Sequence, residues 1–106
     1  MKLAIKEYWE NLKTEYEAAY NVSIFSNYDI LQQYAESFRM YLIPLMCEYP
    51  NNVDVACALA TVEQVLRREE NSIQLLEEFL RKYTDVLSHT EKARVYTNLA
   101  FYHNGE

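Results

Sequence analysis

The chain has almost no residues that favour a break in a helix. It contains one glycine, Gly105, and two prolines in 106 residues, whereas roughly 7% of the residues in ordinary proteins are glycine. Because glycine adopts positive φ angles most readily, tight two-residue hairpins have little support here. The scarcity of glycine predicts a chain that is mostly helical.

The same scarcity excludes several classes of catalytic and binding site. Dinucleotide-binding folds, phosphate-binding loops and EF-hand calcium loops each need glycine at fixed positions. The nucleophile elbow of hydrolases needs two glycines around a serine. A single glycine beside the C-terminus cannot supply any of these patterns, and we expect no cofactor.

Apolar residues recur at spacings of three and four in five stretches, which is the pattern of amphipathic helices. The stretches are residues 3–20, 30–45, 55–66, 73–83 and 93–103. Asn71 and Ser72 break a helix only softly, so the third and fourth stretches could form one helix. The prediction is an all-α fold, a single domain over residues 1–106 with about five helices. Either a bundle or a repeat-like antiparallel helix array satisfies the pattern.

Polar residues mark where the predicted helices begin. The segments Ser26–Asp29 and Ser88–Glu91 each place an acidic residue three positions after a serine, as in a capping box. Asn52 or Asp54 is placed to cap the third helix. One face of the last helix is expected to carry Ala93, Tyr96, Leu99, Ala100 and His103.

A proline interrupts the second helical pattern. Pro44 should kink this helix or end it near Ile43, because proline lacks the N–H that the helix needs. The surrounding run, residues 40–47, is apolar on all sides and is expected to be central in the fold. Cys47 and Cys57 both have apolar neighbours and are expected to be buried free thiols.

Two short segments have the spacing of a known repeat. Trp9, Leu12 and Tyr16 follow W-x2-L-x3-Y, and Tyr96, Asn98, Leu99 and Ala100 follow Y-x-N-L-A. Both segments resemble the first-helix consensus of the tetratricopeptide repeat, although their separation is not a multiple of its 34-residue period. The resemblance implies repeat-like antiparallel helices and, as a function, an adaptor or chaperone that binds a peptide or helix of a partner protein.

Metal binding and catalysis have little support in the sequence. Cys47, Cys57, His89 and His103 include no pair closer than ten positions, whereas zinc sites usually contain a close ligand pair. Arg94 and His103 share a predicted helix but are nine positions apart, too far to meet at one phosphate. We expect no metal, no catalytic residue and no enzymatic activity.

Negative charge is concentrated in one half of the chain. The net charge is −6, and residues 14–66 carry all of it, with seven carboxylates, one arginine and six of the ten tyrosines. Nucleic acids and anionic membranes are bound by Lys and Arg, so neither is expected as a partner. The longest apolar run has eight residues, too few for a membrane span. Charged residues interrupt the N-terminal stretch, so we expect no secretion signal and a cytoplasmic protein.

Carboxylates beside tyrosines suit a cationic protein partner, because acids steer and pair with Arg and Lys while tyrosine stacks on Arg. The leading hypothesis is an immunity- or antitoxin-type inhibitor that covers the cationic active site of a basic nuclease toxin. The tetratricopeptide-like adaptor is the alternative, and an ordinary solvated face would explain the same charges without a partner. The residues predicted to bind the partner are Tyr28, Asp29, Glu36, Glu48, Tyr49 and Asp54.

Overall fold

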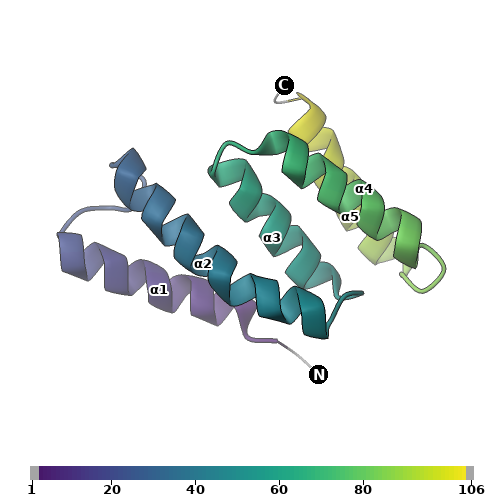
Figure 1. Cartoon of the computed structure of the whole chain (residues 1–106), viewed down its shortest axis with the longest axis horizontal. Coiled ribbons are helices and arrows are strands. Elements are labelled where there is room, and N and C mark those ends of the chain that lie inside the picture. The colour runs from purple at the N-terminus through teal and green to yellow at the C-terminus, as the bar shows by residue number, and fades with distance from the viewer. Residues whose placement is uncertain (1–2, 105–106) are drawn as a thin grey trace.

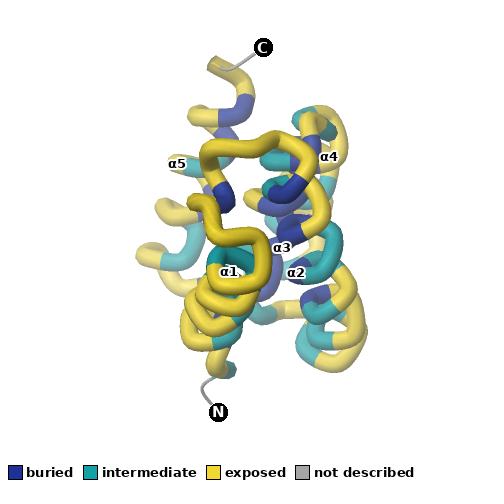
Figure 2. The backbone as a smooth tube through the Cα atoms, turned by 90° about the vertical axis from the view of Figure 1, so that its left-hand side faces the viewer, coloured by how far each residue is buried: buried dark blue, intermediate teal, exposed yellow. Residues whose placement is uncertain are grey.

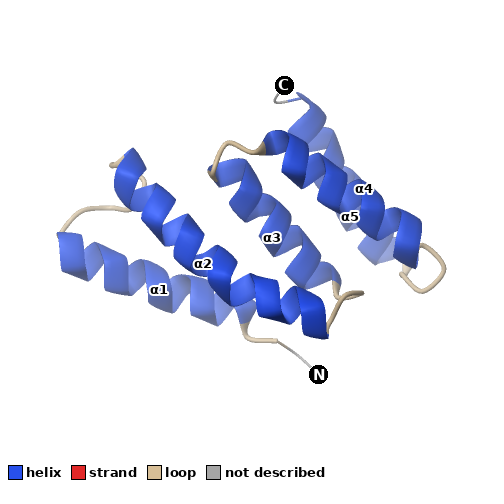
Figure 3. Cartoon of the chain, in the orientation of Figure 1, coloured by secondary structure: helices blue, strands red, loops and turns tan. Residues whose placement is uncertain are grey.

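Five α-helices make up most of residues 3–104, the part of the chain that the computed structural model describes (Figure 3). No strand occurs in that range, and no helix in it is long and apolar enough to cross a membrane. The predicted all-α class is confirmed, and the third and fourth stretches form two separate helices. The helices are α1 (Ile5–Tyr20), α2 (Tyr28–Glu48), α3 (Val53–Val65), α4 (Glu69–Tyr83) and α5 (His89–Asn104).

The helices form an open antiparallel array in which each packs on the next one in the chain (Figure 1). The middle helix, α3, also contacts both α1 and α5. Within the described residues α1 and α5 make no contact with each other, as the first and last helices of a closed bundle would. Of the two architectures that the sequence allows, the array is the one found.

The array has two layers around a central helix. Viewed end-on, α1 and α5 lie on one side, α2 and α4 on the other, and α3 between them (Figure 2). One core cluster joins α3 to α4 and α5, a second joins α3 to α1 and α2, and a third, smaller one lies between α1 and α2. Ala56 and Ala60 face the first cluster, and Val55 and Val62 face the second. The almost uncharged sequence of α3 therefore suits its place at the centre.

The apolar run 40–47 is only partly central, because Leu42 is fully buried and the rest of the run is half-buried or exposed. Met40 is 74% exposed, and Cys47 is exposed while Cys57 is buried. Of the two alternatives predicted for Pro44, a kink or a helix end near Ile43, the helix end is wrong, because α2 continues through Pro44 to Glu48. Both Pro44 and Met40 lie at the surface, where water can hydrate the Met40 carbonyl that lacks a donor, so the helix tolerates the proline.

The buried face of α5 differs from the predicted one. Val95, Leu99 and Tyr102 are buried, whereas Tyr96 is 58% exposed and His103 is exposed. Both faces include Leu99 and both have spacings of three and four. Val95 and Tyr102 belong to the core cluster with α3 and α4, and the Tyr102 hydroxyl reaches the Thr61 hydroxyl at 3.3 Å. Packing on α3 and α4 therefore selects the face with Val95 and Tyr102.

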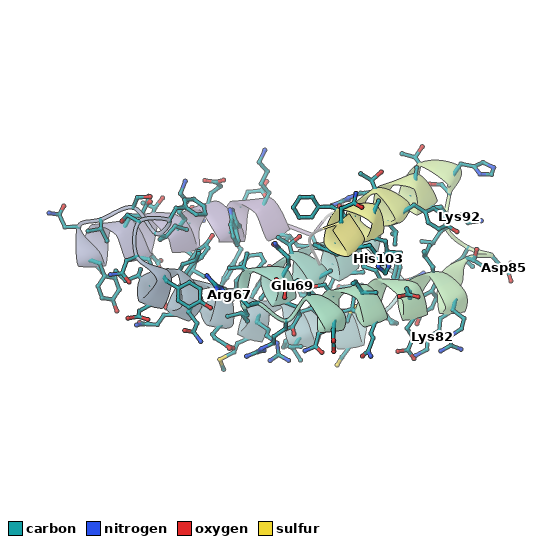
Figure 4. All side chains as sticks on the ribbon, turned by 90° about the horizontal axis from the view of Figure 1, so that it is seen from above. Arg67, Glu69, Lys82, Asp85, Lys92 and His103 are labelled. Atoms are coloured by element: carbon teal, nitrogen blue, oxygen red, sulfur yellow. The ribbon has the colours of Figure 1, made fainter. Side chains whose placement is uncertain are left out.

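Two turns within residues 3–104 need a left-handed residue, and neither uses glycine. Asn21 after α1 has φ 55°, and Arg67 after α3 has φ 62°. The Arg67 N–H donates to the Gln64 carbonyl at 3.0 Å and the Arg68 N–H to the Glu63 carbonyl at 2.8 Å, which is the Schellman arrangement. Arg67, labelled in Figure 4, also lies 4.8 Å from the centre of the Tyr28 ring in a cation–π contact.

Side-chain caps begin three of the helices. The Asn52 side chain accepts from the Val55 N–H, and Ser88 and Glu91 form the predicted reciprocal capping box. The cap of α2 is Asn27 rather than Ser26, one position later than predicted. The Asn27 Oδ1 accepts from the Asp29 N–H at 2.9 Å and from the Ile30 N–H at 3.2 Å.

Replacing Asn27 with alanine should lower the free energy of unfolding by about 1 kcal/mol, because two N–H groups lose their acceptor. Urea unfolding followed by far-UV circular dichroism measures this change. Ser26→Ala is the matched control, since the Ser26 hydroxyl bonds only to the Ser23 carbonyl and caps nothing. A larger loss in Ser26→Ala than in Asn27→Ala would contradict the assignment of the cap.

Candidate functional site

The residues predicted to bind a partner do not form one patch. Tyr28 and Asp29 begin α2, while Glu48 ends it and Tyr49 follows directly. Since α2 has 21 residues, the two pairs lie about 30 Å apart at 1.5 Å per residue. A partner would have to span the full length of α2 to contact both pairs.

The other two predicted residues are paired with arginines of the same chain. Glu36 accepts from Arg68 at 2.9 Å, and Asp54 forms an ion pair with Arg94. Exposed pairs of this kind stabilise a fold little, but each cancels one negative charge at the surface. Asp29 and Glu48 are the members of the predicted set without a Lys or Arg partner in residues 3–104.

A groove of about 550 Å³ lies on the side of the array where α1 and α5 flank α3. Figure 4, which views the array from above, shows α1 and α5 along the same edge of the array. Four segments far apart in the sequence meet at this groove, from the start of the chain, α2, α3 and α5. Its lining consists of Leu3, Ile5, Lys6, Glu7, Trp9, Phe38, Asp54, Cys57, Ala58, Thr61, Arg94 and Asn98.

The floor and the two walls of the groove differ in chemistry. The floor is a stripe of short side chains on α3, with Ala58 and Thr61 one turn apart. The α1 wall is largely apolar, and Trp9 packs edge-on against Phe38 with ring centres 5.0 Å apart. The α5 wall is polar, with Asn98 one turn beyond Arg94. A ligand in the groove would meet an apolar side and a hydrogen-bonding side.

The charges that line the groove balance one another. Asp54 on the floor is paired with Arg94 on the α5 wall. On the α1 wall, Lys6 stands beside Glu7. The groove is therefore close to neutral, in contrast to the chain as a whole, which carries a net charge of −6.

Cys57 lines the groove but is not activated as a nucleophile. Burial raises the pKa of its thiol, and this outweighs the lowering by the Arg94 guanidinium and by a hydrogen bond from Asn98. The thiol is therefore protonated at neutral pH, whereas reactive cysteines are thiolates. His89 and His103 lie at the two ends of α5, and neither is among the described residues that line the groove.

A second hollow extends the groove along the same seam between α3 and α5. It has a volume of about 220 Å³, and one side is formed by Phe101, which is 63% exposed. Gln64 and Phe101 each lie one turn beyond a residue of the first hollow, Thr61 and Asn98. Glu69 closes the far end, where Figure 4 labels it at the start of α4. From Arg94 to Asn104 the seam is about 15 Å long, at 1.5 Å per residue.

Sequence reasoning did not predict this groove, although it singled out some of its residues for other reasons. Trp9 and Asn98 belong to the two tetratricopeptide-like segments, and Asp54 belongs to the predicted acidic surface. Among the residues that the structure describes, no group of His, Cys, Asp and Glu is placed to hold a metal ion. Comparison of the chain with protein-family models, curated proteins and solved structures gave no match.

Proposed function

We propose that the protein is a non-catalytic adaptor that binds a segment of a partner protein in the groove between α1 and α5. The groove itself is the observation that carries this proposal. It combines an apolar wall, a floor of short side chains and a few convergent polar groups, which is the usual composition of a binding site. The exposed ring of Phe101 at its far end adds an aromatic side chain, a residue type that contributes strongly to the energetics of interfaces.

The chemistry of the lining supports binding rather than catalysis. The groove is nearly neutral, so apolar contact would supply most of the affinity. Its thiol is protonated, and its one floor carboxylate, Asp54, is held by Arg94. The described lining therefore contains neither an activated nucleophile nor a histidine that could act as a general base.

Inhibition of a basic nuclease toxin is the second proposal, and the net charge of −6 favours it. That function would use the ends of α2, where Asp29 and Glu48 have no cationic partner in the described chain. The two proposals differ in their response to salt. Association steered by exposed carboxylates weakens steeply as ionic strength rises, whereas binding in a neutral groove does not.

Filling the groove should weaken binding of a partner segment. Thr61 is an exposed residue of the floor, so the long side chain in Thr61→Arg would occupy the groove without entering the core. Peptides selected on the wild-type protein from a phage-displayed random library provide the probe, and fluorescence polarisation measures their affinity. We expect Thr61→Arg to bind these peptides at least about tenfold more weakly than the wild type does.

Gln32→Arg is the matched control, because it adds the same charge at an exposed position of α2 away from the groove. Circular dichroism establishes that both variants retain the helical fold. Equal affinities for wild type, Thr61→Arg and Gln32→Arg would sink the groove proposal. A loss confined to Asp29→Lys and Glu48→Lys, together with a steep dependence on salt, would favour the inhibitor instead.

A further inference from the structure

The groove offers few partners to an exposed peptide backbone. Its walls and floor are helices, whose N–H and C=O groups already bond within each helix. Several of the polar side chains are also engaged, since Asp54 pairs with Arg94 and the Thr61 hydroxyl donates to the Cys57 carbonyl at 2.9 Å. A buried extended segment would bring one unsatisfied N–H and C=O with each residue. Residues 3–104 contain no strand edge on which it could pair.

A helix avoids this cost because its own backbone groups are satisfied before it binds. The width of the groove also suits a helix. Both α1 and α5 pack on α3 but not on each other in the described chain, and packed helix axes lie about 8–10 Å apart. The axes of α1 and α5 are therefore more than one packing distance apart, which leaves the surface of α3 between them open to a further helix about 10–12 Å across.

The floor and the length of the groove set further requirements on the ligand. Because Ala58 and Thr61 are short, the axis of a bound helix can approach α3 closely, with its apolar stripe directed at the floor and at Trp9. The seam of about 15 Å corresponds to about three turns, or about ten residues, of helix.

Charge distinguishes the two ends of the seam. At the end near the start of α1, Lys6 and Glu7 offset each other. At the other end Glu69 lines the second hollow and forms no ion pair with any described residue. A cationic side chain on the ligand would complement Glu69, and the net charge of −6 favours the same sign.

We infer that the groove binds an amphipathic α-helix of a partner protein, about three turns long, with a Lys or Arg at the end that lies beside Glu69. This inference rests on the proposed function of the groove and names the class of partner. The helix packs its apolar stripe between α1 and α5 and leaves its polar face in water. It thereby adds a sixth helix to the array, beside α1, α3 and α5.

The library-selected peptides that lose affinity for Thr61→Arg test this inference. Alanine scanning of each peptide should identify important positions at spacings of three and four, the period of one helix face. A proline in the middle of the peptide should weaken binding on the order of a hundredfold, since it disrupts a helix. The far-UV circular dichroism of the complex should show more helix than the sum of protein and free peptide.

Glu69→Lys tests whether a Lys or Arg of the bound helix lies beside Glu69. It should weaken peptides with a terminal Lys or Arg about tenfold, whereas Glu70→Lys, the same change at the next position outside the hollow, should leave them unchanged. Important positions at a spacing of two, with proline tolerated, would show an extended ligand. An extended ligand, or equal effects of Glu69→Lys and Glu70→Lys, would overturn the inference of a helical ligand and leave the proposed function standing. If no selected peptide bound Thr61→Arg more weakly than the wild type, the proposed function and this inference would both fail.

Discussion

Replacing Glu63 with leucine should lower the free energy of unfolding by about 3 kcal/mol, although Glu63 lies outside the groove lining. Its side chain is only 5% exposed, and it accepts hydrogen bonds from Arg39 on α2 at 2.6 Å and from Asn71 on α4 at 3.0 Å. Arg68 lies 3.7 Å away. Hydrogen bonds to a charged group each contribute about 1.5–3 kcal/mol, and the leucine would leave two donors without their acceptor.

The loss of stability caused by Glu63→Leu should depend on whether Arg39 is present. Arg39→Met alone would leave the buried Glu63 carboxylate short of its closest cation, which also costs about 3 kcal/mol. In the double variant both charges are gone, and an apolar pair can replace a buried ion pair with little penalty. We therefore expect Arg39→Met/Glu63→Leu to be less destabilised than the sum of the two single variants, by more than about 1 kcal/mol.

Urea unfolding of the wild type, the two single variants and the double variant measures this coupling. Glu78→Leu is the control, because Glu78 pairs with Arg81 and Lys82 at the surface and such pairs contribute less than about 1 kcal/mol. Strictly additive losses would contradict the role given to this network. A double variant less destabilised than the sum of the single variants would show that the hydrogen bonds of Glu63 with Arg39 and Asn71 hold α2, α3 and α4 together on the side away from the groove.

The positions of the helices could be predicted because each depends on local sequence. Of the apolar residues predicted for α4, Ile73, Leu76 and Phe79 are buried and Leu80 and Tyr83 are half-buried. Charged residues fill much of the rest of the helix and leave one possible face. In α5 the spacing of apolar residues predicted the wrong buried face. Few charges follow Arg94 in that helix, so two apolar stripes compete, and only the packing of Val95 and Tyr102 on other helices decides between them.

The groove could not be predicted because it depends on how distant helices are placed. Its walls come from the two ends of the chain, and no local spacing reports the distance between them. The acidic surface depends on distant contacts for the same reason. Glu36 and Asp54 are paired with arginines 32 and 40 positions away in the sequence. Charge counted along the chain therefore overstates the charge that is free at the surface.

The stability of the protein should fall steeply as the pH rises above about 10, with Tyr34 as a main cause. Tyr34 is fully buried between α1 and α2, and its hydroxyl donates to the Trp9 carbonyl at 2.9 Å. Burial, and then the negative charges of Glu10 and Glu17, raise the pKa of Tyr34 well above its ordinary value of 10.0. The folded protein therefore keeps this proton at a pH where the unfolded chain has lost it.

The sign follows from the proton count. The unfolded chain binds fewer protons than the folded one above about pH 10, so the free energy of unfolding falls by about 1.4 kcal/mol per pH unit for this group. Below that pH both states are protonated and the contribution of Tyr34 is complete. Burial also raises the pKa of Cys57 and of Tyr102, so both add to the slope, and Cys57 does so from about pH 8.5.

Tyr34→Phe separates the contribution of Tyr34 from the others. At neutral pH it should cost about 1 kcal/mol, because the Trp9 carbonyl loses one donor while the ring still fills its place. Above about pH 10 it should reduce the fall of the unfolding free energy with pH by about 1.4 kcal/mol per pH unit, since the buried phenol is gone.

Tyr96→Phe is the control. It removes an exposed phenol and should leave the pH dependence of the unfolding free energy unchanged. Urea unfolding at pH values between about 8 and 11 measures both slopes. If the free energy of unfolding fell equally with pH in Tyr34→Phe and in the wild type, Tyr34 would not contribute to the pH dependence. The buried Tyr102 and Cys57 would then have to account for all of it.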